Sequence, residues 1–277
     1  MIRRASIPSR INILGEHTDY AGGCSLAFAS QHRLILEAEF IESGVFGEET
    51  VVALWSEAGG PPARLNVSSN IPIGKGMSSS AALCLGIVLC VHGDSLDRQD
   101  ACREAQRLEH VVLGTPCGLL DQMTMMHSVE ECCTLIDFTN LETSTIPYPN
   151  TWKFKLVDSG IQRSLNSEDY RQTTSEKKKK LHVSEENARV HQALNSTNEQ
   201  LGELLNQTHE SLRMIGVSTP EVDSIVKSLQ SKQGVLGARM MGGGFGGMIL
   251  VLVENDGVLP QHPLLVPSKA GFIEELF

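Results

Sequence analysis

Four side chains able to carry charge lie within ten residues near the N-terminus. They are Arg10, Glu16, His17 and Asp19. Apolar residues flank them, and burying such groups without partners is energetically costly. A bound sugar would supply the partners, because its hydroxyls can donate to carboxylates and to an imidazole. On residue chemistry alone, a polar turn after a strand is the alternative interpretation.

A glycine- and serine-rich stretch at residues 72–82 has the composition of an anion site. Gly74 and Gly76 let the backbone approach a ligand closely. The apolar run at 81–91 predicts a buried helix, whose N-terminus would offer unpaired N–H groups and the positive end of its dipole. The stretch is no Walker A loop, since Gly76 follows the lysine where serine or threonine is required. An ordinary helix cap is the alternative.

Two further segments stand out by composition. Asp121 is followed by Gln122 within an otherwise apolar stretch, where a helix N-cap is the plain structural explanation. Residues 237–247 hold six glycines, which carries a large entropic cost on folding. A tight turn between strands would explain two of these glycines, and close approach to a ligand would explain more.

Composition limits the class of protein. A length of 277 residues fits one large domain or two ordinary ones, and 41% hydrophobic residues supply a core. The formal net charge of -10 argues against nucleic acid or an anionic membrane as the main partner. Seven cysteines without a CxxC pair indicate free thiols in a reducing compartment. With no signal-like segment and no 18-residue apolar run, a cytoplasmic location is expected.

Hydrophobic periodicity predicts strands alternating with helices, which is typical of a mixed α/β or α+β class. The expected strands lie within residues 1–15, 25–40, 134–138, 152–158 and 235–253. The expected helices lie within residues 81–91, 98–113, 118–128, 168–181, 187–215 and 220–230. Residues 44–60 and 145–149 are expected to form turns or connections. The run from Lys177 to Lys180 is interpreted as a solvated helix face.

The motifs together resemble those of the galactokinases, which belong to the GHMP small-molecule kinases. The segments that carry the resemblance are residues 8–23, 74–81, 109–122, 157–170 and 237–247. The positions that depart from the family's usual residues are Ser9, Met77, Met241 and Gly243. The resemblance extends from residue 6 to about residue 253.

This resemblance implies a GHMP kinase fold of the α+β class. An N-terminal domain similar to ribosomal protein S5 would span residues 1–148, and a ferredoxin-like C-terminal domain would span residues 149–277. The interval between Gly23 and Gly74 is shorter than is usual in the family. Much of the adenine-side wall comes from that interval, so ATP would bind more weakly or use a different adenine pocket.

The resemblance also implies ATP-dependent phosphorylation of the anomeric hydroxyl of galactose, giving α-D-galactose 1-phosphate. Asp121 would act as the base, while Arg10 would keep Asp121 ionised and stabilise developing charge. The implied sugar contacts are Arg10, Glu16, His17, Asp19, Gly118, Asp121 and Tyr170. The implied ATP contacts are Gly74, Lys75, Gly76, Met77, Ser78, Ser79, Ser80 and Ala81. The implied Mg²⁺ ligands are Ser79 and Glu109.

Three alternatives stay open at this point. The substrate could be a related sugar, such as N-acetylgalactosamine, L-arabinose or galacturonate. The protein could be a non-catalytic sensor of galactose and ATP, although the intact Ala81-Ala82 pair disfavours this class. It could be another GHMP kinase, although the Glu-His-Thr-Asp segment at 16–19 disfavours substrates with few hydroxyls. The expected partners are a sugar and ATP, with no nucleic acid and no membrane, and the expected state is a monomer.

Overall fold

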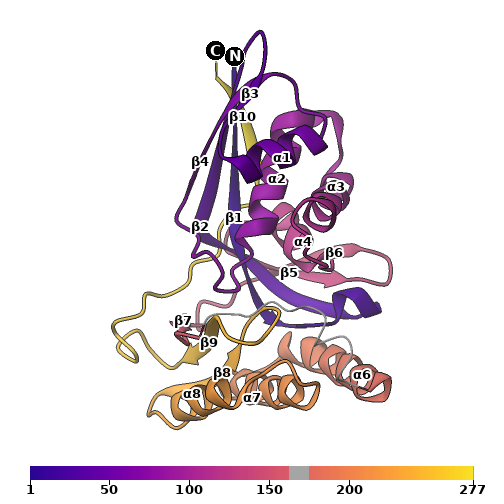
Figure 1. Ribbon diagram of the computed structural model, residues 1–277. Coiled ribbons are helices and arrows are strands. Elements are labelled where there is room, and N and C mark those ends of the chain that lie inside the picture. The colour runs from indigo at the N-terminus through magenta and orange to yellow at the C-terminus, as the bar shows by residue number, and fades with distance from the viewer. Residues whose placement is uncertain (162–174, 277) are drawn as a thin grey trace.

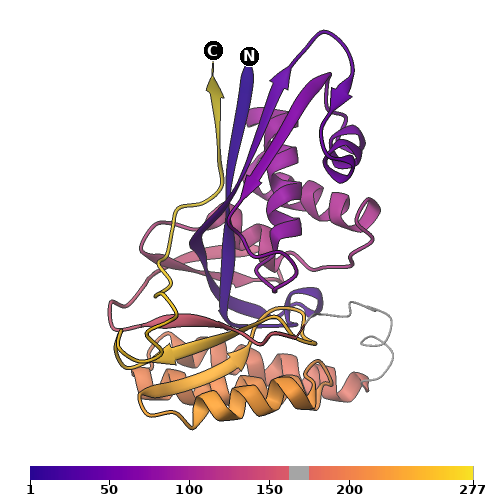
Figure 2. The ribbon, with the colours of Figure 1, turned by 60° about the vertical axis from the view of Figure 1, so that its left-hand side comes forward.

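The computed structural model describes residues 1–161 and 175–276. Two β-sheets of different size follow one another along the molecule, with helices packed on their outer faces (Figures 1 and 2). Both ends of the described chain lie at the far end of the large sheet, and the small sheet lies at the opposite end. This mixture of helix and sheet confirms the expected α+β class.

The large sheet is built on two long antiparallel strands. Its order is β10-β1-β2-β4-β3, and β5 pairs with both β2 and β6. The strands are β1 (Ile2–Leu14), β2 (Cys24–Phe40), β3 (Val45–Phe46), β4 (Ala63–Ser69), β5 (Cys132–Asp137), β6 (Glu142–Pro147) and β10 (Phe272–Leu276). The β1–β2 ladder runs from Ile2 opposite Glu39 to Leu14 opposite Leu26. The charged segment near the N-terminus is therefore the connection between β1 and β2.

Four helices lie on one side of the large sheet (Figure 1). They are α1 (Glu49–Glu57), α2 (Ser79–His92), α3 (Arg98–Val111) and α4 (Leu120–His127). Helix α2 packs directly on β1 and β2, and its small and aliphatic residues are buried, as the continuous apolar run predicts. Helices α3 and α4 pack on α2. This layer carries Asp121 and the glycine- and serine-rich residues 72–82, here called the phosphate loop, toward the end of β1.

Residues 44–60 were expected to be turn-rich around a short apolar run from Val51 to Trp55, and this is wrong for the run itself, because the structure contains α1 there. Glu48 caps the helix by accepting hydrogen bonds from the backbone N–H groups of Thr50 and Val51. Val51, Leu54 and Trp55 then lie on one buried face at helical spacing. The glycines and prolines that flank this segment mark its ends rather than its interior.

Residues 145–149 are likewise not a plain connection. Edge strand β6 runs antiparallel to β5, with Thr145 opposite Thr134, and ends at Pro147. A proline at this end of an edge strand leaves no ladder N–H unpaired. The division proposed at residue 148 stays a prediction, and strand β10 returns to pair with β1 in the large sheet.

The small sheet has the order β7-β9-β8 and is antiparallel throughout. Its strands are β7 (Phe154–Asp158), β8 (Val235–Met240) and β9 (Met248–Val253). The helices of this part are α6 (Glu176–Ala193), α7 (Asn198–Met214) and α8 (Pro220–Gln230). Helices α7 and α8 pack on β8. Figures 1 and 2 place the small sheet between these helices and the large sheet.

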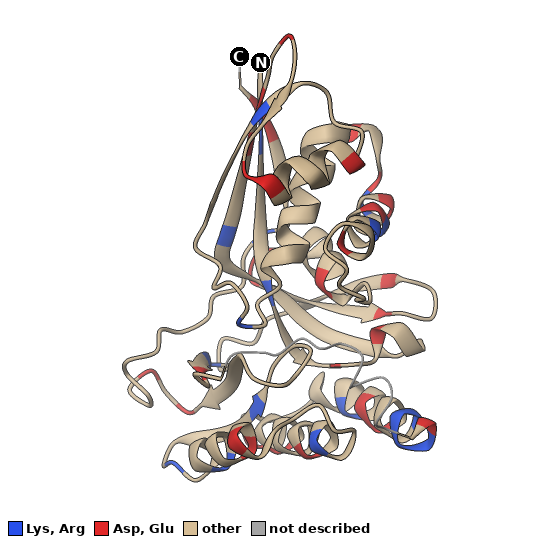
Figure 3. Cartoon of the chain, viewed as in Figure 1, with Lys and Arg blue, Asp and Glu red and all other residues tan. Residues whose placement is uncertain are grey.

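The expected helices in this part are partly confirmed. Helix α8 begins at Pro220 as predicted, with Thr219 as its cap. A single helix α6 spans the predicted gap between residues 181 and 187, and residues 168–174 lie outside the described part of the chain. The lysines of 177–180 lie on the outer, largely exposed side of α6, which confirms the solvated face (Figure 3). Among the described residues, no helix has the length and apolar character needed to cross a membrane.

Candidate functional site

Arg10 and Asp121 form an ion pair at the centre of the molecule. Arg10 projects from β1 and is buried, and its Nε lies 2.6 Å from Oδ1 of Asp121 in the first turn of α4. Its Nη1 donates to the carbonyl oxygen of Gly76 at 2.6 Å. The hydroxyl of Ser78 donates to the other carboxylate oxygen of Asp121. One cation thus joins a carboxylate to the phosphate loop, and the two partners of the ion pair lie 111 positions apart in the sequence.

The phosphate-loop stretch turns sharply before α2. Gly74 and Gly76 have φ values of 69° and 82°, a region that favours glycine, and a side chain at Gly74 would meet open space. Ser78 precedes the first residue of α2 but does not cap it, because its hydroxyl points to Asp121. The first N–H groups of α2 therefore have no side-chain cap from Ser78 and can face an anion.

The start of β9, directly after the glycine-rich residues 237–247, contacts the phosphate loop. The N–H of Met248 donates to the carbonyl oxygen of Lys75 at 2.8 Å. The Lys75 ammonium also lies 2.8 Å from the carboxylate of Asp158, at the end of β7. The Lys75 ammonium holds the pKa of Asp158 below its usual range, although partial burial opposes this. Lys75 is thus paired with a carboxylate in the chain as it stands.

Glu109 is a buried carboxylate on α3 behind this loop. Its Oε1 accepts a hydrogen bond from the hydroxyl of Ser80 at 2.6 Å, and its Oε2 accepts one from Gln122 Nε2 at 2.6 Å. Burial raises the pKa of Glu109 to about 7, and the carboxylate of Asp121 adds to this, while Ser80 opposes it. The structure therefore pairs Ser80, and not the predicted Ser79, with Glu109.

This donor set fits Mg²⁺. Magnesium prefers oxygen ligands and is usually held by one or two carboxylates together with substrate phosphates. Glu109 supplies a carboxylate whose burial disfavours its charged form, so a nearby cation would relieve that cost. Among the described residues, no group of three His, Cys, Asp or Glu side chains forms a complete protein cage for a metal.

The connection between β1 and β2, here called the acidic loop (residues 15–24), faces the start of α4. Asp19 Oδ2 accepts a hydrogen bond from the N–H of Leu120 at 3.2 Å. A Cβ built on Gly118 would overlap the Asp19 carboxylate. Burial raises the pKa of Asp19 to about 6, with added repulsion from Asp121 and opposition from the Leu120 N–H. The loop and α4 therefore bring two carboxylates, Asp19 and Asp121, to one region.

The other predicted sugar contacts in the acidic loop, His17 and Glu16, have partners outside α4. His17 has a φ of 58° and its Nδ1 lies 3.3 Å from the hydroxyl of Tyr20. Glu16 is buried, and its Oε1 accepts from the N–H of Gly242 at 2.6 Å and from Arg239 Nη1 at 3.3 Å. Burial raises the pKa of Glu16, but Arg239, Arg10 and the N–H of Gly242 together outweigh this effect and lower the value to about 2. Tyr170 lies outside the described residues.

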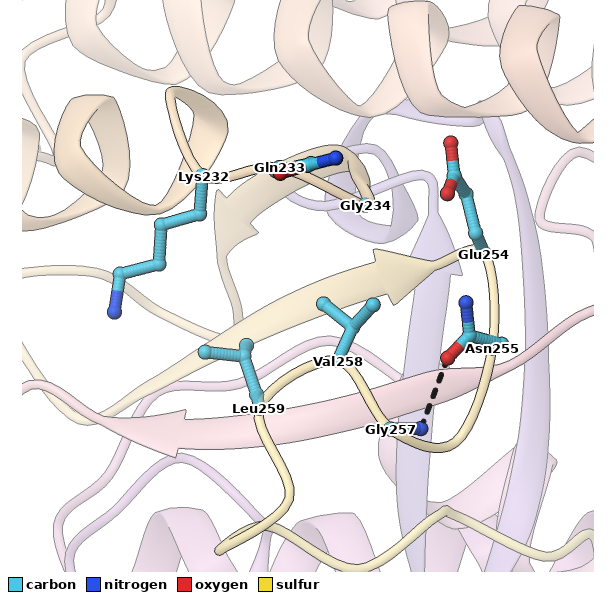
Figure 4. A pocket seen from close by; sticks show the side chains of 8 residues that line it. All are labelled: Lys232, Gln233, Gly234, Glu254, Asn255, Gly257, Val258 and Leu259. Atoms are coloured by element: carbon cyan, nitrogen blue, oxygen red, sulfur yellow. Dashed lines mark hydrogen bonds between the residues drawn. The ribbon is translucent and has the colours of Figure 1, made fainter.

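A separate hollow lies at the far end of the small sheet (Figure 4). The residues that line it are Lys232, Gln233, Gly234, Glu254, Asn255, Gly257, Val258 and Leu259. The Asn255 side chain there accepts from the N–H of Gly257 at 3.0 Å, which closes the turn upon itself. None of the lining residues belongs to the phosphate loop, the acidic loop or the Arg10–Asp121 pair.

Comparison with known proteins identifies the family of the chain. The GHMP kinase N-terminal domain matches residues 46–128, and the GHMP kinase C-terminal domain matches residues 190–260. The galactokinase galactose-binding signature matches residues 4–39. A galactokinase from Thermotoga maritima is 33% identical over 313 residues, covering 91% of this chain and 89% of that protein. The chain belongs to the galactokinase family. Members of this family are sugar kinases.

Two solved structures share the fold of this galactokinase-family chain. The crystal structure of Lactococcus lactis galactokinase complexed with galactose matches with a TM-score of 0.84 and 22% identity, covering 98% of this chain and 95% of that chain. The mevalonate kinase of Methanococcus jannaschii matches with a TM-score of 0.76 and 19% identity, covering 97% and 98%. The 313-residue alignment with the Thermotoga relative exceeds the 277 residues of this chain, so that relative carries segments that this chain lacks.

Sequence reasoning missed two groups of this galactokinase-family site. Ser80 was predicted only as an ATP contact and Ser79 as the metal ligand, because which serine faces α3 depends on where α2 begins. Arg239 was noted only as part of a glycine-rich run, although it is fully buried beneath the acidic loop. An arginine within a buried glycine-rich strand is itself a signal, since a buried cation needs partners.

Proposed function

We propose that this protein transfers the γ-phosphoryl group of ATP to the anomeric hydroxyl of galactose, giving α-D-galactose 1-phosphate. The observation that carries the proposal is the contact of Arg10 with both Asp121 and the phosphate loop. It puts a base beside the start of α2, where the phosphates of a nucleotide would bind. Family membership supports the same chemistry, because the relatives are named galactokinases.

Asp121 would accept the proton of the attacking hydroxyl. Arg10 pairs with the carboxylate of Asp121, and it would stabilise charge that develops during transfer. Both Asp121 oxygens have donors in the chain as it stands, from Arg10 and Ser78. An incoming sugar hydroxyl would replace Ser78 at Oδ2, which would free the Ser78 hydroxyl to donate to a phosphate oxygen. Positioning and charge neutralisation then make up most of the catalysis, as in phosphoryl transfer generally.

The nucleotide would bind along the phosphate loop. The proposed contacts are Gly74, Lys75, Gly76, Met77, Ser78, Ser79, Ser80 and Ala81, of which Met77 is buried and acts through its backbone. The carboxylate of Glu109 and the hydroxyl of Ser80 would hold Mg²⁺. When bound, Mg²⁺ would neutralise negative charge on the nucleotide phosphates. Lys75 would exchange its Asp158 partner for a phosphate.

The acidic loop would select the sugar. Asp19 and His17 are proposed to read hydroxyls away from the reacting carbon, with Gly118 lying against the ring. Glu16 has one oxygen engaged by Gly242 and Arg239, so only its second oxygen can turn to the sugar. Tyr170 is proposed as a further sugar contact. We place the enzyme in the cytoplasm as a monomer, and its seven free thiols suit a reducing compartment.

The decisive experiment is a substrate panel with purified protein and Mg-ATP, followed by coupled detection of ADP. The panel contains galactose, N-acetylgalactosamine, L-arabinose, galacturonate, mevalonate and a sugar-free control. The proposal expects ADP release with galactose well above the control, and product analysis should give the 1-phosphate. Turnover only with another sugar would replace galactose as the substrate. Calorimetric binding of galactose without turnover would instead favour a sensor.

The two serines at the start of α2 should differ in their effect on metal use. Ser80→Ala removes the hydroxyl that contacts Glu109, so we expect about a tenfold rise in the Mg²⁺ concentration needed for half-maximal rate. Ser79→Ala leaves that contact intact and should change the requirement by less than about twofold. The measurement is a titration of Mg²⁺ at saturating galactose and ATP. The larger effect in Ser79→Ala would restore Ser79 as the metal ligand.

Sugar affinity should fall in acid because the pKa of Asp19 is raised to about 6. Below that pH the folded enzyme carries a protonated Asp19, which loses one hydrogen-bond acceptor for a sugar hydroxyl. At saturating Mg-ATP, kcat/KM for galactose is expected to drop about tenfold per pH unit below the pKa. Asp19→Asn should flatten this acid limb. If the acid limb of the kcat/KM profile stays at the same pH in Asp19→Asn, the titrating group is not Asp19.

A further inference from the structure

We infer that the acidic loop is held in its sugar-reading conformation by the C-terminal half of the chain, with Asn187 and Glu186 of α6 and Arg239 of β8 as positioning residues. This inference rests on the proposed function, because it concerns how the loop presents Asp19 and His17. The three residues lie more than 150 positions from the loop in the sequence. They would set affinity for the sugar without touching it.

Helix α6 holds the loop at both of its ends. The N–H of Gly15 donates to Oε1 of Glu186 at 2.8 Å, where the chain leaves β1. The N–H of Cys24 donates to Oδ1 of Asn187 at 2.8 Å, where the chain enters β2. Between these points, Nε2 of His182 lies 2.8 Å from the carbonyl oxygen of Glu16. Since that oxygen can only accept, the imidazole donates.

Strand β8 holds the loop from beneath through Arg239. The fully buried guanidinium donates to the carbonyl oxygens of Asn12 at 2.5 Å and Ile13 at 2.9 Å, near the end of strand β1 before the loop. Its Nη1 also lies 3.3 Å from Oε1 of Glu16. A planar fork of donors suits several fixed acceptors at once. Arg239 thus ties the small sheet to the strand that also carries Arg10.

The loop has an unusual backbone conformation that contacts from other elements help to fix. Gly15, His17 and Gly22 all have positive φ values, at 100°, 58° and 68°. Within the loop, the carbonyl oxygen of Thr18 accepts from the N–H groups of Ala21 and Gly23. The Thr18 hydroxyl lies 2.9 Å from the carbonyl oxygens of both Gly15 and Cys24, and the N–H of Phe138 donates to the carbonyl oxygen of Gly23 at 2.9 Å. Helix α6 adds the acceptors for the N–H groups of Gly15 and Cys24. A loop that is fixed before ligand arrives loses less freedom on binding, so its supports contribute to affinity.

The supports are themselves fixed by buried partners. Glu186 is fully buried, and its carboxylate also accepts from the Thr208 hydroxyl at 3.0 Å and from Arg189 Nε at 2.7 Å. The ion pair and the hydrogen bonds together fix the orientation of this buried carboxylate. The other ring nitrogen of His182, Nδ1, lies 2.7 Å from the Ser211 hydroxyl. Helix α6 therefore presents fixed acceptors and a fixed donor to the loop.

The test compares two asparagines of the same half of the chain. Asn187→Ala removes the acceptor for Cys24, whereas Asn198→Ala removes bonds to Thr151, outside the acidic loop. Both side chains are half-buried, on helices, and bonded to a backbone group of an earlier segment. KM for galactose and for ATP, kcat and the melting temperature are measured for both. We expect Asn187→Ala to raise KM for galactose about three- to tenfold and KM for ATP less than about twofold.

Asn198→Ala should leave both KM values within about twofold of the unaltered protein. Its melting temperature should change about as much as that of Asn187→Ala. Glu186→Gln provides a second arm, because its amide oxygen can still accept from Gly15, so its KM should rise less than that of Glu186→Leu. Equal KM changes in the two asparagine variants would overturn the inference, as would an unchanged KM for galactose in Asn187→Ala. Absence of galactose turnover in the unaltered protein would instead reject the proposed function.

Discussion

Replacing Asp121 with asparagine is expected to lower kcat for galactose by about 10³-fold, in line with the loss of a general base. The amide can still accept from Arg10 Nε, so the buried arginine keeps a partner and the fold should survive. What disappears is the group that takes the proton from the attacking hydroxyl. KM values for galactose and ATP should change by less than about fivefold, because asparagine keeps the shape of the side chain.

Asp223→Asn is a matched control for this variant. Asp223 is also an aspartate on a helix, paired with an arginine at 2.8 Å, and its side chain is 24% exposed against 25% for Asp121. The control should lose no more than about half of kcat, since Asp223 pairs with Arg213 and His209 on the far side of the small sheet. Steady-state kinetics with coupled ADP detection makes the comparison. If Asp121→Asn retains about a tenth or more of kcat, the loss is no larger than that expected for one missing hydrogen bond. That result would show that Asp121 is not the base.

The elements that could be predicted are those whose signals are local. Strands β1 and β2 follow from alternating or continuous apolar residues, and α2 and α8 follow from an apolar run and from a threonine–proline start. Helix α1 was missed because its capping residue is a glutamate and its flanks are rich in glycine and proline. Its helical face becomes visible only when Val51, Leu54 and Trp55 are counted at a period of 3.6.

The site could be predicted where residue types alone limit the chemistry. Arg10, Asp121 and the phosphate loop were brought together by their resemblance to a known pattern, and the structure joins them directly. Ser79 was predicted as the metal ligand, whereas the serine that contacts Glu109 is Ser80, because the serine that faces α3 depends on the first turn of α2 starting after a residue with φ of 58°. The position of Glu16 could not be foreseen either. Its partner Arg239 is 223 positions away and meets it only through the packing of two sheets.

A single methyl group at Gly118 is expected to disrupt sugar binding. The backbone of Gly118 is not in the positive-φ region, so alanine is acceptable in conformation, but its Cβ would overlap the carboxylate of Asp19. Asp19 is a flexible side-chain end and would move rather than unfold the chain. We expect Gly118→Ala to raise KM for galactose by about 10- to 100-fold, the range for losing hydrogen bonds to a charged group. KM for ATP should change by less than about twofold, and the melting temperature by only a few degrees.

The mechanism of this effect can be isolated with a double-mutant cycle. If Gly118→Ala acts by displacing Asp19, then Asp19→Asn should cause a rise in KM of similar size, and the double variant should be little worse than either single one. Gly257→Ala serves as the control for adding a methyl group, because Gly257 also has an ordinary φ, lies in the distant hollow and leaves the acidic loop untouched (Figure 4). Additive effects of the two substitutions would show that Gly118 contacts the sugar independently of Asp19. The specificity of the loop would then reside in the close approach of the α4 backbone rather than in one carboxylate.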